Sequence, residues 1–151
     1  MLKSLIGLAV IIYCMFQAGM VVAKNKDKVM KRTQNNTRIL LRMLEIKDSG
    51  VRISQKLGLD GNEKIAIYGN GIVGKQIIKQ LSLEGVSVAY VVDRACSTFR
   101  VEDIPVYRSD MKLPKADVMI ITPTDDYANI KHKLEHKEIY QFVSVNVLLE
   151  G

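Results

Sequence analysis

The chain has 151 residues, of which 48% are hydrophobic and 25% are charged. These values are those of ordinary globular domains, and they exclude wholesale disorder, a collagen-like repeat and a disulfide scaffold. The two cysteines, Cys14 and Cys96, lie in different sequence contexts, so we expect free thiols and a reducing compartment.

The net charge of +6 is concentrated in one segment of the chain. Residues 24–47 hold eight basic and two acidic side chains, whereas residues 48–151 have a net charge of −1. A basic nucleic-acid-binding domain would carry its charge over the folded part of the chain. We therefore expect no nucleic-acid partner.

Residues 4–23 form an uncharged stretch, SLIGLAVIIYCMFQAGMVVA. As an α-helix it would extend about 30 Å, the thickness of a bilayer core, and its apolar residues lie on all sides. We predict a transmembrane helix, with the bilayer as a partner. Two alternatives stay open, a cleaved secretory signal and a helix buried in a larger assembly.

The flanks of this stretch predict its orientation. Only Lys3 precedes it, whereas five basic residues follow within residues 24–32. Basic residues accumulate on the cytoplasmic side of a span. The prediction is a single-pass protein of the inner (plasma) membrane with a cytoplasmic C-terminal domain.

Residues 24–59 are predicted to form a basic, helical juxtamembrane connector that breaks at Ser49 and Gly50. Its lysines are suited to anionic lipid headgroups. The alternative is a dimerising coiled coil, which would make the protein a homo-oligomer. Thr33 and Thr37 interrupt the heptads and count against this alternative.

From residue 60 the pattern becomes that of an α/β domain. Residues 64–68 predict a buried strand, residues 69–74 spell GNGIVG, and a helical pattern follows over residues 75–81. In a dinucleotide-binding turn, Gly69 permits the tight bend, Gly71 lets a pyrophosphate approach, and Gly74 lets the helix pack closely on the strand. The helix N-terminus then faces the anion.

A second strand over residues 86–92 ends at Asp93, where a carboxylate accepts the ribose 2′-hydroxyl. The neighbouring Arg94 could accept a 2′-phosphate or stack on adenine, so NAD and NADP both stay open. The structural alternative is that the glycines serve only the turn and the packing.

The rest of the chain predicts a polar loop over residues 94–103, strands at 104–107, 117–122 and 139–145, a helix over 125–138, and a final helical turn after residue 146. The predicted fold is a Rossmann-like parallel sheet of four or five strands with flanking helices, in the order 3-2-1-4-5. Its crevice lies between strands one and four. The predicted cofactor-binding residues are Gly69, Asn70, Gly71, Ile72, Val73, Gly74, Asp93, Arg94, Thr122, Pro123 and Thr124.

These motifs, IAIYGNGIVG at residues 65–74, VVD at 91–93, IPV at 104–106 and DVMIIT at 117–122, resemble the small Rossmann domains of bacterial surface-polysaccharide gene clusters. They are similar to the NAD(P)- or CoA-binding domain that follows the membrane helices of polysaccharide-type nucleotide-sugar dehydratases. The resemblance covers about residues 36–151. It implies a nucleotide, nucleotide-sugar or CoA ligand and a protein partner in envelope glycan assembly.

Two motifs compete for a catalytic role. Tyr127 and Lys131 have the Y-x-x-x-K spacing of short-chain dehydrogenases, and residues 132–136 spell the H-x-x-E-H of a zinc site. The first lies too early in the fold for that family, and lysines crowd the second. No catalytic residue is assigned, and no metal is expected.

The functional prediction is a membrane-tethered cytoplasmic module that binds a dinucleotide or nucleotide-sugar and acts with a partner in envelope polysaccharide biosynthesis. The chain is not expected to be an enzyme on its own. The alternatives are a stand-alone NAD(P)-dependent oxidoreductase or epimerase, and a non-binding scaffold for oligomerisation.

Overall fold

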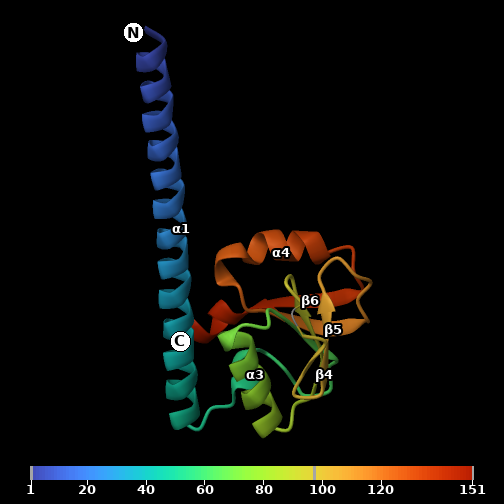
Figure 1. Cartoon of the computed structure of the whole chain (residues 1–151). Helices are drawn as coiled ribbons and strands as arrows, with labels where there is room; N and C mark the ends of the chain where they lie inside the picture. Colours follow the sequence, from blue (N-terminus) through green and yellow to red (C-terminus); the bar gives the residue numbers. More distant parts are fainter. Residues whose placement is uncertain (1, 97, 151) are drawn as a thin grey trace. The chain divides into compact units, whose positions relative to one another are not determined.

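The computed structural model shows a mixed α/β protein with a six-stranded, mostly parallel sheet (Figure 1). It describes residues 2–96 and 98–150, with side chains from Tyr13 onward. The chain forms two compact units, residues 1–35 and residues 36–151. The second unit contains the sheet.

The first helix, α1 (Leu2–Asp48), ends where the sequence predicts a break. Gly50 has a φ of +74°, a value that side chains disfavour. Its N–H donates to the carbonyl of Lys47 at 3.1 Å, and the Ser49 hydroxyl donates to that of Ile46 at 2.7 Å. These bonds satisfy carbonyls left free at the helix end, and the short helix α2 (Ile53–Lys56) follows.

The sheet is built from β1 (Ile65–Tyr68), β2 (Val88–Asp93), β3 (Arg100–Val101), β4 (Ile104–Arg108), β5 (Ala116–Ile121) and β6 (Ile139–Ser144), in the order β3-β4-β2-β1-β5-β6. Helix α3 (Ile72–Leu83) connects β1 to β2, and α4 (Tyr127–Leu134) connects β5 to β6. The predicted order of the five parallel strands is confirmed. Residues 109–115, all within the described part of the chain, connect β4 to β5 without a helix.

The sixth strand corrects one prediction. Residues 94–103 were expected to be loop, but β3 pairs antiparallel with β4, Val101 opposite Ile104. The two residues between these strands, Glu102 and Asp103, both have positive φ, at 47° and 65°. Two-residue hairpin turns of this kind favour Asn-Gly, Asp-Gly or Gly-Gly, and the sequence has no Gly there.

The second half of the chain also differs at its ends. The helix expected over residues 125–138 is shorter, because a 3₁₀ turn, η1 (Thr124–Asp126), precedes α4 and a turn replaces its last residues. The expected final turn is the 3₁₀ helix η2 (Val145–Leu149), where the Ser144 hydroxyl accepts from the Asn146 N–H at 3.2 Å.

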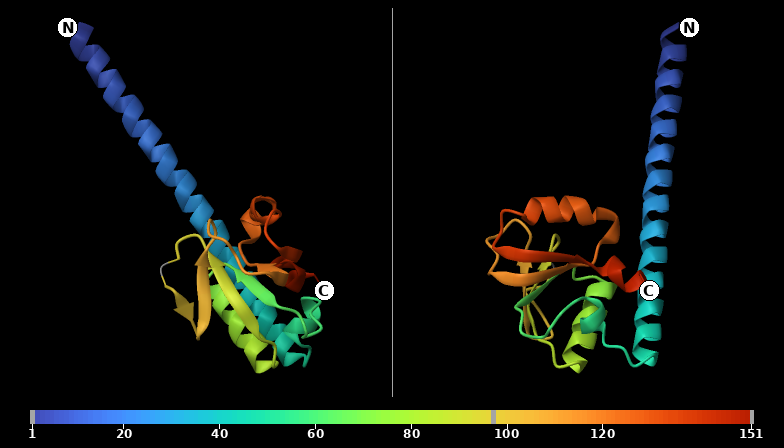
Figure 2. Two further views of the ribbon diagram at one scale, coloured as in Figure 1. Left: turned by 90° about the vertical axis from the view of Figure 1, so that its right-hand side faces the viewer. Right: turned by 180° about the vertical axis from the view of Figure 1, so that it is seen from behind.

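Each face of the sheet has its own core, and the strand alternation divides β1 between them. Ile65 and Ile67 join the first core, whereas Ala66 and Tyr68 join the second. Helix α3 covers the first face and α4 the second (Figure 2). The first core also takes buried side chains from residues 36–59, namely Ile39, Met43, Ile46, Ile53, Leu57 and Leu59.

The compact unit therefore begins at Asn36, within the segment assigned above to the connector. A second link holds this segment. The Glu84 carboxylate accepts the backbone N–H groups of Ile53 and Ser54 at 2.8 and 2.9 Å. Burial alone would raise the pKa of Glu84, but these hydrogen bonds outweigh it and the pKa is lowered. The α/β unit thus includes residues 36–59.

Within the part of the chain whose side chains are described, no helix has both the length and the apolar character needed to cross a bilayer. The predicted span over residues 4–23 falls partly outside that part, because the side chains of residues 4–12 are not described.

A truncation tests where the folded unit begins. A chain of residues 36–151 should fold, with a cooperative thermal transition followed by circular dichroism. A chain of residues 60–151 should not, because it lacks six buried side chains worth about 1.5–3 kcal/mol each, and whole domains have only about 5–15 kcal/mol of stability. Equal transitions for both chains would show that residues 36–59 are dispensable.

Candidate functional site

The turn after β1 is held by close contacts around Gly69. This residue has a φ of +107°, and a Cβ at its position would lie 2.3 Å from the Thr122 hydroxyl oxygen. Its N–H donates to the Val92 carbonyl at 2.8 Å. Glycine at position 69 is therefore required both by the backbone angle and by the neighbouring strand.

Gly74 brings the first turn of α3 against this bend. A Cβ at residue 74 would lie 2.0 Å from the carbonyl oxygen of Gly69, too close for any side chain. The sequence predicted this close helix-to-strand packing, and the geometry confirms it.

Gly71 differs from both, because the fold does not require a glycine there. It precedes α3 with φ −82° and ψ −173°, which any residue adopts, and a Cβ would meet nothing within 4 Å. Helix α3 begins without a side-chain cap and without an acidic residue in its first turn. Its first N–H groups and positive dipole end therefore remain suited to an anion.

The two residues that follow Gly71 take opposite environments. Val73 is buried in the first core, whereas Ile72 is 62% exposed at the start of α3. The exposed Ile72 gives apolar surface beside the uncapped helix end.

Asp93 lies at the carboxyl end of β2, as predicted, and it fastens the turn. One carboxylate oxygen accepts the Asn70 N–H at 2.7 Å and the other accepts the Ala95 N–H at 2.8 Å. Each oxygen retains a second lone pair, so the carboxylate can still accept from a ribose hydroxyl. Asp93 thus has a structural role that the sequence did not reveal.

Arg94 pairs with Asp126, which precedes α4, at 3.4 Å. Because β2 and β5 lie on either side of β1, this pair passes over the end of β1. Tyr68, the last residue of β1, is close to both charges. Burial raises the pKa of Tyr68, and hydrogen bonding with Ser109 and the charge of Arg94 only partly oppose this.

The predicted residues after β5 are Thr122, Pro123 and Thr124. The Thr122 hydroxyl is buried and donates to the Tyr68 carbonyl at 2.9 Å, so its proton is used by the fold. Pro123 packs against Gly69, with its Cδ 3.4 Å from the position of a Cβ there. Thr124 begins η1 and is half-buried. The predicted residues lie together where β1, β2 and β5 end, but the side chains of Val73 and Thr122 are buried.

The structure adds residues that sequence reasoning missed, namely Tyr68, Ser109 and Asp126. Asn70 was predicted, but not its buried side-chain oxygen, which has no hydrogen-bond partner among the described residues. Its amide nitrogen donates to the Thr98 hydroxyl at 3.4 Å. Asp126 in η1 meets Arg94, which follows β2, only in the folded chain. No sequence signal would therefore have found Asp126.

One residue from each of the two competing motifs has a side-chain contact in the structure. The Tyr127 hydroxyl donates to the Phe142 carbonyl at 3.2 Å, and His132 is exposed and faces Glu135 at 3.3 Å. Among the described residues, no group of three or more His, Cys, Asp or Glu side chains is placed to hold a metal ion.

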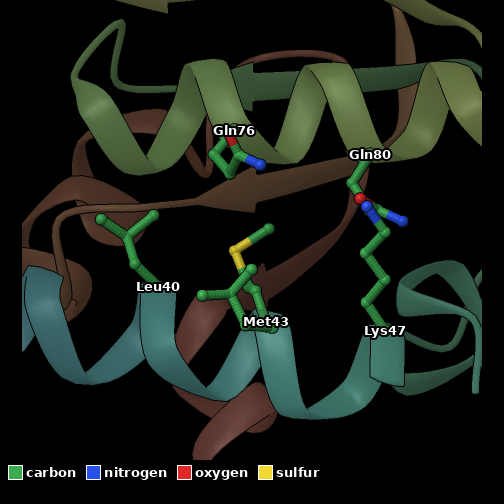
Figure 3. A pocket seen from close by; sticks show the side chains of 6 residues that line it. Leu40, Met43, Lys47, Gln76 and Gln80 are labelled. Atoms are coloured by element: carbon green, nitrogen blue, oxygen red, sulfur yellow. The ribbon is translucent and has the colours of Figure 1, made fainter. Parts of the chain in front are cut away.

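A separate hollow lies between the end of α1 and α3 (Figure 3). Its volume is about 140 Å³, and the side chains of the two helices point toward one another across it. It is lined by Leu40, Met43, Leu44, Lys47, Gln76 and Gln80. None of these belongs to residues 69–74, so this hollow is not part of the glycine turn.

Comparisons of the chain with protein-family models, with characterised proteins and with solved structures gave no match.

Two alanine substitutions separate the roles of the glycines. Gly74→Ala should lower the free energy of unfolding by about 1–3 kcal/mol or more, because its Cβ overlaps the Gly69 carbonyl. Gly71→Ala should leave it unchanged or raise it by about 0.4–1 kcal/mol, because the backbone angle is ordinary and the space is open. Urea denaturation measures both, and equal losses would contradict the assignment.

Proposed function

We propose that residues 36–151 form a Rossmann-like module that binds a dinucleotide or nucleotide-sugar through its phosphates, and that residues 4–23 tether it to the bacterial inner membrane. The main support for a bound ligand is Gly71, a glycine that the fold does not require. The other two glycines of the motif are accounted for by the fold, whereas the open space at Gly71 lies against an uncapped helix N-terminus.

The polar groups around the turn support a nucleotide over a simple anion. Asp93 retains lone pairs for a ribose hydroxyl, Arg94 can meet a phosphate or stack on a base, and Ile72 offers apolar surface. NAD, NADP, CoA and nucleotide-sugars all combine phosphates with a nucleoside. They form the ligand class for this site.

A partner supplies the chemistry in this proposal. The tyrosine of the Y-x-x-x-K motif donates a hydrogen bond to a backbone carbonyl. The resemblance to domains of surface-polysaccharide gene clusters gives the class of partner, a protein of envelope glycan assembly. The stand-alone oxidoreductase or epimerase is the less supported alternative.

One observation favours the scaffold alternative. Both Asp93 oxygens already accept backbone N–H groups, so the carboxylate would be explained without any ligand. The scaffold reading gives no reason for Gly71, however, and the two readings differ in a binding measurement.

The membrane tether rests on the apolar character of residues 13–23. These residues carry no charge, and Tyr13, Met15 and Phe16 are each more than 60% exposed. A run of exposed large apolar side chains on one helix is stable when lipid covers it. The basic residues that follow support an orientation in which the α/β unit lies on the cytoplasmic side.

The ligand site is tested by titration calorimetry of the full chain with NAD, NADP, CoA and a panel of nucleotide-sugars. Gly71→Val should abolish binding of whichever compound binds, because the side chain would occupy the phosphate position, yet leave the thermal transition intact. Asp93→Asn should weaken binding by a smaller factor. As a matched control, Lys79→Ala on the exposed side of α3 should bind like wild type. If neither wild type nor Gly71→Val binds any compound, the non-binding scaffold is supported, whereas equal binding by both proteins would place the ligand away from Gly71.

The tether is tested by cysteine labelling in a chain whose own cysteines are replaced by serine. In intact spheroplasts, a membrane-impermeant maleimide should label Lys3→Cys but not Glu150→Cys, which should react only after lysis. Labelling of Glu150→Cys from outside would reverse the orientation. Release of the protein by alkaline carbonate would contradict the anchor itself.

A further inference from the structure

The basic side chains of residues 24–32 lie free on the surface of α1. Lys24, Lys26, Lys28, Lys31 and Arg32 are all exposed, and none forms an ion pair with a described residue. Asp27 is the one acidic residue among them. This segment thus has an unbalanced positive charge that the rest of its own unit does not neutralise.

Three of these basic residues share one face of the helix. Lys24, Lys28 and Lys31 follow the i, i+4, i+7 spacing that places side chains on one face of a helix. The charge also ends sharply at Lys24, because residues 13–23 have no charged side chain. An uncharged segment and a basic segment therefore follow one another along the helix axis.

This order distinguishes a helix that enters a membrane from one that lies on it. A surface helix places its basic residues on one face and its apolar residues on the other along the same length. Here an all-round apolar segment is followed by a basic one, which places the ammonium groups at headgroup depth when the apolar segment is in lipid.

The net positive charge of the protein lies mainly in this segment and not in the α/β unit. Residues 36–151 carry sixteen basic and fifteen acidic side chains, so the unit is almost neutral. A nucleic-acid-binding protein needs its positive surface on the folded unit or on a long arm. Nine residues that directly adjoin an apolar stretch are instead suited to an anionic bilayer surface.

We propose that Lys24, Lys28 and Lys31 form a lipid-binding face that gathers anionic phospholipid around α1. The proposal rests on the membrane tether proposed above, and it adds the chemistry of the lipid. The ammonium groups bind headgroup phosphates by Coulomb attraction, and this attraction weakens as salt rises.

The test uses the full chain reconstituted into phosphatidylcholine vesicles with a minor fraction of fluorescent lipid. The native cysteines are replaced by serine, and a donor dye is attached at Val29→Cys, an exposed position within the basic segment. Energy transfer to labelled phosphatidylglycerol is compared with transfer to labelled phosphatidylcholine. Wild type should show an enrichment of phosphatidylglycerol of roughly threefold or more in 0.1 M salt, falling toward one in 0.5 M salt.

Two variants carry the decision. Changing Lys24, Lys28 and Lys31 together to Gln should bring the enrichment to about one. Changing the exposed Lys112, Lys131 and Lys133 to Gln removes the same charge from the α/β unit and should leave the enrichment at the wild-type value.

The other outcomes separate the failures. Wild-type protein that enters the vesicles but shows no lipid preference overturns the lipid-binding face and leaves the tether standing. Protein that does not enter vesicles of either composition overturns the tether, and the lipid-binding face with it. A 30-nucleotide RNA that binds wild type but not the Lys24, Lys28, Lys31 variant, without lipid preference, assigns the segment to nucleic acid instead.

Discussion

The contact between Gly74 and Gly69 is the constraint on which the site depends. A side-chain carbon at residue 74 would lie 2.0 Å from the Gly69 carbonyl oxygen, so the backbone of α3 rests directly on the turn that leaves β1. This contact fixes the direction of α3 and presents its first N–H groups at the end of the central strand. Any added bulk would tilt the helix and move those groups.

The same contact connects the core to the site. Ile77 and Leu81 of α3 are fully buried on the first face of the sheet, together with Ile39, Met43 and Ile46 of α1. The end of α1 thus stabilises the helix whose N-terminus meets the proposed ligand. An α/β unit cut off from residues 36–59 would lose support for α3 as well as stability.

Much of the fold was predictable because it follows from local patterns. The β-branched runs predicted the five parallel strands. The glycine motif, together with Asp93 at the end of the second strand, predicted their order. The boundary at Asn36 was not predictable, because the apolar residues 39, 43 and 46 suit a free amphipathic helix and a docked one equally well. The β3–β4 hairpin was missed because its turn uses Glu102 and Asp103 in place of the usual glycine.

The sequence predicted only those parts of the candidate site that follow from the spacing of the glycine motif. The roles of Gly69 and Gly74 were foreseen from the motif, and the structure confirms both. Chain topology, by contrast, brings Arg94 to Asp126 across 32 positions in the sequence, and no local pattern records such a pair. The two bonds of the Asp93 carboxylate to the loop also need three dimensions, because the sequence pointed only toward a ribose.

The most direct measurement of the central claim is an NMR titration of residues 36–151, labelled with ¹⁵N, with NAD and with a nucleotide-sugar. If the glycine turn binds the phosphates, the largest amide shifts should fall on residues 71–74 at the start of α3, and smaller ones on Asp93 and Arg94. Shifts confined to the hollow between α1 and α3, or no shifts with either compound, would contradict the account.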